Sequence, residues 1–290
     1  MLVKKIAALL AVSFMLTAAA CDKKAPEPPP PSETTAEAAP PAEVSGLEVT
    51  FLDVGKADSM VLLTENSTVI IDCGERGDGK QIVNFLKERE RETVDYLILT
   101  HYDKDHVGGA GKVVKDLDVK NILGPDHNQL SDEVDKYIAA MREKDITPQL
   151  VTEDISFELD GVQYTVDAPD KTNYGPNDDN DFSLVTKVVH GDNTLIFAGD
   201  AMEARLGEVM DIGDCDLLKV PYHGRKIANL GDFLDEVKPE YAVVCTSKEE
   251  FAGTVQKQLN NRGIKFWSTC FNGRVTAVSD GKEITVTSEK

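Results

Sequence analysis

The segment LILTHYDKDHVGG, Leu97–Gly109, places two histidines and two aspartates directly after an apolar run. The run DYLILT is short and almost wholly apolar, which predicts a buried strand followed by a polar loop. Binding sites in layered α/β proteins collect at such strand ends, because side chains converge where the backbone turns. The two closing glycines would let the loop pass close to a bound group. The polar side chains that can converge are His101, Asp103, Asp105 and His106.

Imidazole and carboxylate groups in one cavity suit Zn²⁺, Mn²⁺ or Fe²⁺. A solvated polar loop is the alternative, and a lone His-x-Asp would favour it, but four such groups favour a metal site. Two further candidates also follow apolar strands, Asp200 in LIFAGDAM and His223 in LLKVPYHGR. Alone, Asp200 would suggest a helix N-cap and His223 a structural histidine. Beside the first cluster, both become ligand candidates.

Strand and helix patterns alternate along the chain after residue 46. Apolar residues at helical spacing predict helices over residues 79–92, 131–144, 201–210 and 248–263. Alternating patterns predict hairpins over 155–169, 182–200 and 272–288, with turns at Asp160-Gly161 and at 191–193. Strands mixed with helices throughout indicate an α/β fold in which helices cover sheets.

The first 21 residues resemble a secretory signal peptide. Lys4 and Lys5 precede an apolar stretch, Ile6–Leu16, that is too short to span a bilayer comfortably. Small residues then precede Cys21 in an arrangement similar to a lipobox, with Ala18 at the position where Leu is usual. We therefore expect an exported lipoprotein, anchored by a lipid on Cys21 to the outer face of the cell membrane. An ordinary signal peptide with a chance cysteine, or an uncleaved anchor, is the alternative.

Residues 22–46 are rich in Pro, Ala and Glu, so they cannot bury a core and predict a disordered tether. Residues 47–290 contain no second linker and no internal repeat, which favours one domain. No stretch after the signal peptide approaches the ~20 apolar residues of a membrane span, so a transport channel is not expected.

The full chain carries a net charge of −20. Such a surface repels polyanions at long range, which disfavours long duplex DNA as a partner. A small or oligomeric anionic substrate stays open, because metal ions can supply positive charge inside a site. The domain's cysteines form no C-x-x-C pair, which disfavours a cysteine metal site and leaves both disulfides and free thiols open. They are Cys73, Cys215, Cys245 and Cys270.

Seven stretches spread over nearly the whole predicted domain carry a family resemblance. They are FLDVGKADSMVL, IIDCG, LILTHYDKDHVGG, NDFSLV, LIFAGD, LLKVPYHG and GRVTAVSDG. They resemble the metallo-β-lactamase fold superfamily, whose first signature is H-x-H-x-D-H, and more closely the metallo-hydrolase domain of ComEC-type DNA-uptake proteins. That domain usually carries Asp at the second histidine, as Asp103 is here. The resemblance implies a four-layer αββα sandwich with a metal site at one edge.

The resemblance also implies two divalent metal ions, with Zn²⁺ favoured and Mn²⁺ as the alternative. Asp200 would bridge the two ions. The other ligands of the first ion would be His101 and Asp103, and those of the second ion would be Asp105, His106 and His223.

The third ligand of the first ion stays open. Related proteins place a separate histidine before the bridging aspartate, and only His127 and His190 stand in that interval here. A loop role is favoured for His127, and a solvated turn for His190. Asn180 and Asp181 stand just before FSLV, where the family carries Asn-rich sequence, so the resemblance implies that one of them would fill this shell.

Catalytic roles are expected for Asp105, Tyr222 and Arg225. Tyr222 or Arg225 would steady an anionic transition state. Asp58 and Asp72 would hold ligand histidines by their second ring nitrogen. Two metal ions would supply hydroxide at neutral pH. These roles predict a metal-dependent hydrolase, and the resemblance implies phosphodiesters in nucleotides or short DNA as its substrate.

Two departures from the family pattern flank the expected site. Tyr222–Arg225 reads Tyr-His-Gly-Arg where His-His-Gly-Ser is usual, and Gly55–Asp58 reads Gly-Lys-Ala-Asp where Gly-Gln-Gly-Asp is usual. These two departures affect the prediction of the substrate more than the prediction of a metal site. The alternatives are a non-catalytic binding lipoprotein on the same fold and a hydrolase of small esters or lactones. Because Asp200 and His223 are both retained, the enzyme is favoured.

Overall fold

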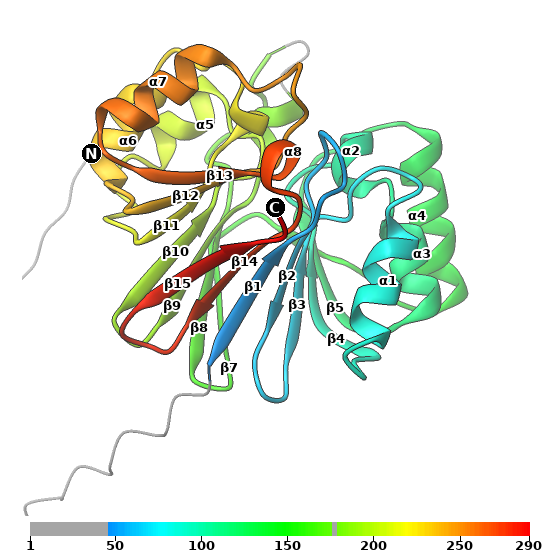
Figure 1. The fold of residues 1–290 in the computed structure, drawn as a ribbon. Coiled ribbons are helices and arrows are strands. Elements are labelled where there is room, and N and C mark those ends of the chain that lie inside the picture. Colours follow the sequence, from blue (N-terminus) through cyan, green and yellow to red (C-terminus); the bar gives the residue numbers. More distant parts are fainter. Residues whose placement is uncertain (1–45, 176–178) are drawn as a thin grey trace, which may run out of the picture. The chain divides into compact units, whose positions relative to one another are not determined.

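Two β-sheets pack face to face, and helices cover both outer faces (Figure 1). This computed structural model describes residues 46–175 and 179–290. The predicted signal peptide, Cys21 and almost all of the predicted tether therefore lie outside the described residues. Among those described, no helix combines the length and apolarity that a membrane crossing needs.

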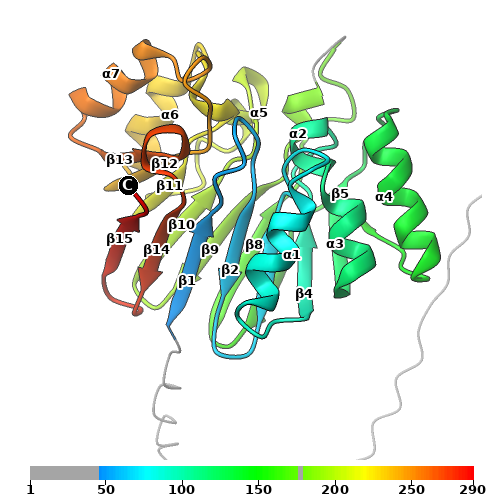
Figure 2. The same ribbon diagram turned by 45° about the vertical axis from the view of Figure 1, so that its right-hand side comes forward.

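The first sheet has eight strands in the order β15-β14-β1-β2-β3-β4-β5-β6. Strands β3 to β6 run parallel, and the other neighbours are antiparallel. The helices α1, α3 and α4 lie on its outer face (Figure 2). The strands are β1 Leu47–Phe51, β2 Met60–Leu63, β3 Thr68–Ile71, β4 Thr93–Ile98, β5 Asp118–Pro125, β6 Gln149–Val151, β14 Val275–Ser279 and β15 Ile284–Ser288. The helices are α1 Gly79–Lys87, α2 Lys104–Val107, α3 Ala110–Asp116 and α4 Asp132–Glu143.

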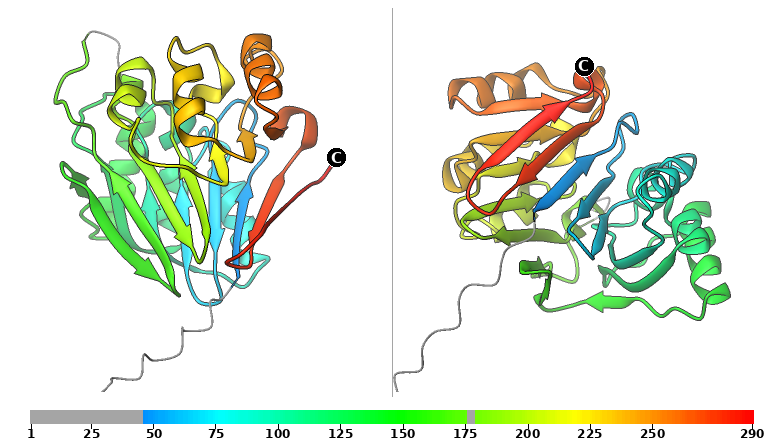
Figure 3. Two further views of the ribbon diagram at one scale, coloured as in Figure 1. Left: turned by 90° about the vertical axis from the view of Figure 1, so that its left-hand side faces the viewer. Right: turned by 60° about the horizontal axis from the view of Figure 1, so that its bottom comes forward.

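The second sheet has seven strands in the order β13-β12-β11-β10-β9-β8-β7, of which β10 to β13 run parallel. The helices α5, α6 and α7 cover its outer face (Figure 3). The strands are β7 Ile155–Leu159, β8 Val162–Asp167, β9 Val185–His190, β10 Asn193–Phe197, β11 Leu217–Lys219, β12 Tyr241–Val244 and β13 Lys265–Ser268. The helices are α5 Glu203–Glu208, α6 Leu230–Val237, α7 Gly253–Asn261 and α8 Thr269–Asn272, with 3₁₀ turns η1 Asp179–Phe182 and η2 Tyr222–Gly224.

Three apolar cores hold these four layers together. Side chains alternate between the faces of a strand. In β3, Val69 and Ile71 therefore enter the core between the sheets, and Ile70 enters the core beneath the helices of the first sheet. In β10, Phe197 faces the other sheet and Ile196 faces α5 and α6. Burial on both faces explains the wholly apolar strands, and the predicted αββα sandwich is confirmed.

Predicted and observed elements differ mainly at their ends. The predicted turn at Asp160-Gly161 is confirmed, with both residues at positive φ as a tight hairpin requires. The loop predicted after β4 instead begins with one helical turn, α2, because the N–H groups of His106 and Val107 donate to the Asp103 carbonyl. The helix predicted over residues 248–263 begins only at Gly253.

The sheets bring the ends of their strands together at one edge. In the first sheet, Asp72 directly follows β3, and the His101–His106 segment follows β4. In the second sheet, Asp200 follows β10 and His223 follows β11. Segments that are more than ninety residues apart in sequence therefore meet across the sandwich.

Candidate metal centre

Three histidines and one aspartate from both sheets converge at this edge. His101, His106 and His223 are at most 1% exposed and Asp200 is 3% exposed. The rings of His101 and His106 lie 4.0 Å apart between centroids, and those of His106 and His223 lie 5.3 Å apart. Asp200 Oδ2 lies 3.4 Å from His106 Nε2 and 3.0 Å from His223 Nε2.

The donor atoms of this group fit a metal ion. The Nε2 atoms of His101, His106 and His223 are buried and have no hydrogen-bond partner among the described residues, and Asp200 Oδ1 is in the same state. Buried polar atoms are normally paired, so four unpaired atoms in one place call for a ligand. Two donors bound to one tetrahedral Zn²⁺ would be separated by about 3.3 Å. The 3.4 and 3.0 Å separations around Asp200 agree with that value.

Asp72 lies behind His106, on the side away from Asp200. Its Oδ2 is 2.8 Å from His106 Nδ1, and it also accepts hydrogen bonds from the backbone and hydroxyl of Thr100 at 2.8 and 2.7 Å. A carboxylate at Nδ1 places the proton on that nitrogen and leaves Nε2 free to bind a metal. Asp72 therefore contacts the second ring nitrogen of His106, which is the contact that its predicted orienting role requires.

Asp58 lies in the same way behind His223. Its Oδ1 is 3.3 Å from His223 Nδ1, and the Cys245 carbonyl is 3.2 Å from the same nitrogen. Asp58 also pairs with the buried ammonium of Lys219. Asp58, His106, Asp200 and His223 all offer ligand atoms within 4.8 Å of one another. Because Asp58 is already engaged by Lys219 and faces Nδ1 of His223, we assign it the orienting role.

Lys219 is a residue of this site that the sequence analysis missed. It is fully buried, it donates to the Gly199 carbonyl at 2.8 Å, and it lies 3.7 Å from Asp200 Oδ1. It therefore compensates the charge of Asp58 and fixes the backbone that precedes Asp200. A charged residue inside the apolar run LLKV was the available signal, because buried lysines normally have acidic partners.

The buried carboxylates give the site a strongly negative potential. Burial by itself would lower the pKa of His223, but Asp200 and Asp58 raise that pKa to about 9. Burial also lowers the pKa of His106, but Asp200 and Asp72 outweigh this effect and raise that pKa well above the ordinary value. A divalent cation would be attracted by the same carboxylates and would replace the protons on these histidines.

The remaining residues of the quoted segment lie at the mouth of the site. Asp103 Oδ2 is 3.6 Å from His101 Nε2, and Gln129 donates to Asp103 Oδ1 at 2.6 Å. Asp105 Oδ2 is 3.7 Å from His223 Nε2 and accepts a hydrogen bond from Lys56 at 2.8 Å. Gln129 and Lys56 are contacts that spacing alone could not reveal.

The glycines after this segment have a role other than the expected one. A Cβ at Gly109 would lie 2.2 Å from the Cys73 carbonyl and 2.7 Å from the Gly79 nitrogen. The close approach is therefore to the chain itself, where the segment packs against the start of α1. Contact with a bound group is not what requires glycine here.

Asn180 and Asp181 separate into different environments. Asp181 Oδ1 accepts from the backbone N–H groups of Met202 and Arg205, at 2.9 and 3.0 Å, and so fixes the first turn of α5. Asn180 lines the cavity above the site, and its Oδ1 is buried without a hydrogen-bond partner among the described residues. Of the two, Asn180 faces the cavity, and its role as a metal ligand stays a prediction.

The other two histidines lie away from the cluster. His127 Nε2 is 2.8 Å from Asp179 Oδ1, and its ring stacks on Phe182, in agreement with a loop role. His190 was expected in a solvated turn, and this expectation is wrong. His190 is fully buried with Nδ1 2.7 Å from Ser279 Oγ, because the β9–β10 hairpin packs against the β14–β15 turn.

A strained turn presents His223 to the site. Tyr222 and His223 have φ values of 50° and 51°, a region that non-glycine residues seldom adopt. Such strain persists only where the surroundings enforce it, and it is frequent at functional sites. Gly224 has φ 71°, and a Cβ there would lie 2.7 Å from Val244. Glycine at position 224 therefore fits the tight backbone that follows His223 and points its ring toward Asp200.

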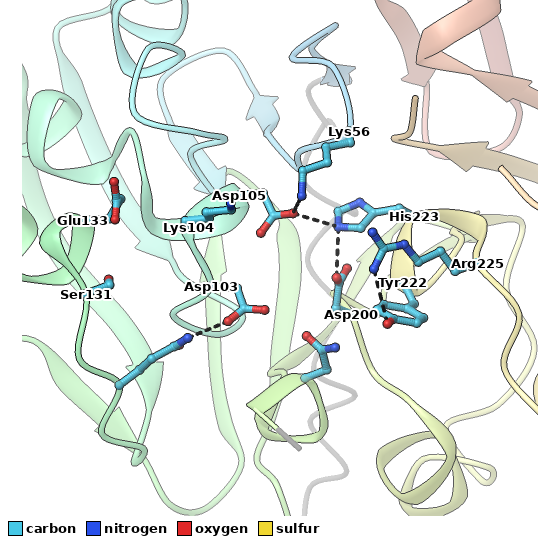
Figure 4. Close-up of a pocket in the computed structure, with 12 residues that line it drawn as sticks. Lys56, Asp103, Lys104, Asp105, Ser131, Glu133, Asp200, Tyr222, His223 and Arg225 are labelled. Carbon is cyan, nitrogen blue, oxygen red and sulfur yellow. Dashed lines mark hydrogen bonds and ion pairs between the residues drawn. The ribbon is translucent and has the colours of Figure 1, made fainter. Parts of the chain in front are cut away.

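A cavity of about 310 Å³ opens above these residues (Figure 4). This volume lies at the small end of the ~300–1,000 Å³ range of ligand sites. Tyr222 and Arg225 stand at its rim, with Arg225 Nη1 3.3 Å from the Tyr222 hydroxyl. Its basic lining residues are Lys56, Lys104 and Arg225, and its acidic ones are Asp103, Asp105, Glu133 and Asp200. The ligand and catalytic roles of all these residues stay predictions.

The chain is similar in sequence to known competence proteins. The chain is 28% identical over 222 residues to ComE operon protein 3 of Bacillus subtilis (strain 168), covering 69% of this chain and 28% of that protein. It is 27% identical over 247 residues to competence protein ComA of Neisseria gonorrhoeae, covering 82% of this chain and 32% of that protein. The chain thus spans about a third or less of the length of these relatives.

A solved structure supports the fold. The metallo-β-lactamase fold protein YhfI from Bacillus subtilis superposes with a TM-score of 0.53 at 12% identity, covering 77% of this chain and 96% of that one. Residues 52–248 match the sequence profile of the metallo-beta-lactamase superfamily. This match covers the predicted ligands from both sheets and more than half of the chain. The chain therefore belongs to the metallo-β-lactamase superfamily.

Proposed function

We propose that this protein is a metal-dependent hydrolase of phosphodiesters, acting on nucleotides or short DNA outside the cell membrane. The observation that carries the hydrolase is the convergence of the buried Nε2 atoms of His106 and His223 on Asp200 beneath an open cavity, with the His101 ring beside that of His106. The phosphodiester substrate rests on similarity to competence proteins and on the basic residues at the cavity mouth.

Two divalent metal ions fit this proposal, with Zn²⁺ favoured and Mn²⁺ as the alternative. Asp200 would contact both ions. His101, Asp103 and Asn180 would complete one shell, and Asp105, His106 and His223 would complete the other. When bound, such ions supply a water of lowered pKa and neutralise charge that develops on a substrate oxygen.

The chain itself would orient the ligands and hold the substrate. Asp72 and Asp58 fix the rings of His106 and His223, so that both Nε2 atoms point at Asp200. Arg225 is held by Glu250 and by the Tyr222 hydroxyl. A guanidinium fixed in this way can donate to a phosphate oxygen at the cavity mouth without a large loss of side-chain entropy.

The substrate is proposed to be short. The net charge of −20 opposes the approach of a long polyanion, whereas a small one needs only the local field of the metal site. The cavity lining carries three basic and four acidic side chains, so bound divalent cations would make it positive. A nucleotide or a short oligonucleotide is both short enough to avoid the repulsion and anionic enough to bind a positive site.

The proposal is tested by metal analysis together with hydrolysis assays. The purified protein would be loaded with Zn²⁺ or Mn²⁺ and assayed on bis-p-nitrophenyl phosphate, short single-stranded DNA and a lactone. Phosphodiester turnover that is lost in both His106→Ala and Asp200→Ala variants is the expected result. Bound metal without turnover of any substrate would support a binding lipoprotein instead, and turnover of the lactone alone would support the ester hydrolase.

We also propose that the chain is exported and lipid-anchored through Cys21. The support is the sequence pattern of its first 21 residues.

A further inference from the structure

Lys56 brings a positive charge into contact with a predicted metal ligand. It lies in the loop between β1 and β2, and its Nζ donates to Asp105 Oδ2 at 2.8 Å. The side chain of Asp105 is only 11% exposed, whereas that of Lys56 is 31% exposed. Figure 4 shows Lys56 reaching down from this loop toward the cluster of Asp105, His223 and Asp200.

The oxygen that binds Lys56 also faces the metal site. Asp105 Oδ2 lies 3.7 Å from His223 Nε2, and that nitrogen lies 3.0 Å from Asp200 Oδ2. An ion held by Asp105, His223 and Asp200 would therefore share Asp105 Oδ2 with the ammonium. Two cations on one carboxylate repel each other, and the repulsion is larger for a divalent ion than for a monovalent one.

The charge at this position distinguishes Lys56 from the other basic residues of the cavity. Arg225 is already bound by Glu250. Lys104 lines the same cavity, but within the described part of the chain it forms no ion pair with a carboxylate of the site. In the Gly-Gln-Gly-Asp pattern that residues 55–58 resemble, the same position carries a neutral glutamine, which can donate a hydrogen bond without a charge.

We propose that Lys56 competes with a metal ion for Asp105 and makes the ion at Asp105 the more weakly bound of the two. The inference rests on the two-ion site of the proposed function. The tighter ion is the one that does not depend on Asp105. The ion at Asp105 then exchanges readily, and its occupancy follows the free metal concentration.

Metal titration of the purified protein tests this without a substrate. After removal of metal, Mn²⁺ or Zn²⁺ binding would be followed by calorimetry in the wild type and in Lys56→Gln, with thermal melting as a check of folding. Two binding steps of unequal affinity are expected in the wild type. Lys56→Gln should tighten the weaker step by about tenfold or more, because a neighbouring positive charge is removed.

Two further variants separate a direct contact from a general charge effect. Lys104→Gln removes a lysine from the same cavity and should leave both steps unchanged. In an Asp105→Asn background the contested carboxylate is gone, so Lys56→Gln should no longer change metal affinity. Co²⁺ absorption spectra provide a second readout of the coordination around each ion.

The outcomes distinguish this inference from the proposed function. Identical isotherms for the wild type and Lys56→Gln would overturn the inference and leave the hydrolase proposal standing. An equal effect of Lys104→Gln would also overturn it, since long-range charge would then explain the change. If no variant bound any metal, the proposed function would fail and the inference would fail with it.

Discussion

Replacing Asp72 by Asn should weaken metal binding while the protein stays folded. Asp72 is fully buried and faces His106 Nδ1 at 2.8 Å. The substitution keeps the size of the side chain but removes the negative charge that fixes the imidazole and increases its basicity. Asn is the suitable replacement because Asp72 has φ 59°, a conformation that Asn tolerates better than most residues.

The size of the effect follows from the contacts of Asp72. Loss of a partner behind a ligand histidine typically lowers metal affinity by about 10- to 100-fold. That corresponds to about 1.4–2.7 kcal/mol of binding free energy. Asn keeps one oxygen, which can still accept from the Thr100 N–H, but it places an NH₂ donor where Asp72 Oδ2 accepts from the Thr100 hydroxyl and faces His106 Nδ1. This change should lower the free energy of unfolding by about 1–2 kcal/mol. Folding should therefore survive although metal affinity falls.

The measurement is a competition titration between the protein and a coloured chelator. Asp116→Asn is the matched control, because it removes the same charge from an exposed carboxylate that pairs with Lys112 at the end of α3. A folded Asp72→Asn variant that binds metal within about twofold of the wild type would refute the orienting role. An equal loss in Asp116→Asn would attribute the effect to net charge.

Four other changes have expected outcomes. Lys219→Met should lower the free energy of unfolding by about 3–5 kcal/mol in a denaturant titration, because the buried charge of Asp58 loses its partner. Asp160→Asn should lower the free energy of unfolding by about 1 kcal/mol at neutral pH, since the Asp160 carboxylate accepts several hydrogen bonds from the 64–67 turn. These bonds hold the pKa of Asp160 below its ordinary value of 3.8. The stabilisation is therefore complete above pH 3.8 and is lost as the pH falls through the lower folded-state pKa, so melting temperatures of variant and wild type should converge in acid. Asp181→Ala should lower the free energy of unfolding by about 1 kcal/mol, because the N–H groups at the start of α5 lose their acceptor. Thermal melting would show this loss, and the metal stoichiometry should not change. Cys21→Ser should move the protein from the membrane fraction to the soluble exported fraction in cells, and an unchanged distribution would contradict the lipid anchor.

Local patterns in the sequence were sufficient to predict the layers and the position of the site. The apolar strands are buried on both faces, so their runs of apolar residues are unbroken and easy to recognise. The residues that follow β4, β10 and β11 could each be predicted to lie at a strand end, where binding sites collect. That they meet across the two sheets was implied by the family resemblance. The layered α/β class and the six candidate ligands came from this kind of information, whereas the four-layer αββα sandwich and the family came from the resemblance of seven longer stretches.

Sequence patterns were least informative where the environment of a residue depends on a distant partner. His190 was placed in solvent because only the turn residues beside it were considered, whereas its partner Ser279 is 89 residues away. Asn180 and Asp181 could not be separated by sequence, since their difference arises from contacts with α5 and with the cavity. Lys219 was overlooked because the carboxylate it compensates, Asp58, lies in the β1–β2 loop of the opposite sheet.

The sequence by itself determined which groups are available for chemistry, through the spacing His-x-Asp-x-Asp-His and the apolar strands that precede each candidate ligand. The tertiary structure alone decided which atoms face one another. Nε2 of His106 and of His223 faces Asp200, Nδ1 of the same rings faces Asp72 and Asp58, and the ammonium of Lys56 contacts Asp105. The reason is physical. Periodicity along a chain reports which face of an element is buried, whereas hydrogen bonds and ion pairs depend on distances of a few ångströms between segments that only the packed sandwich brings together.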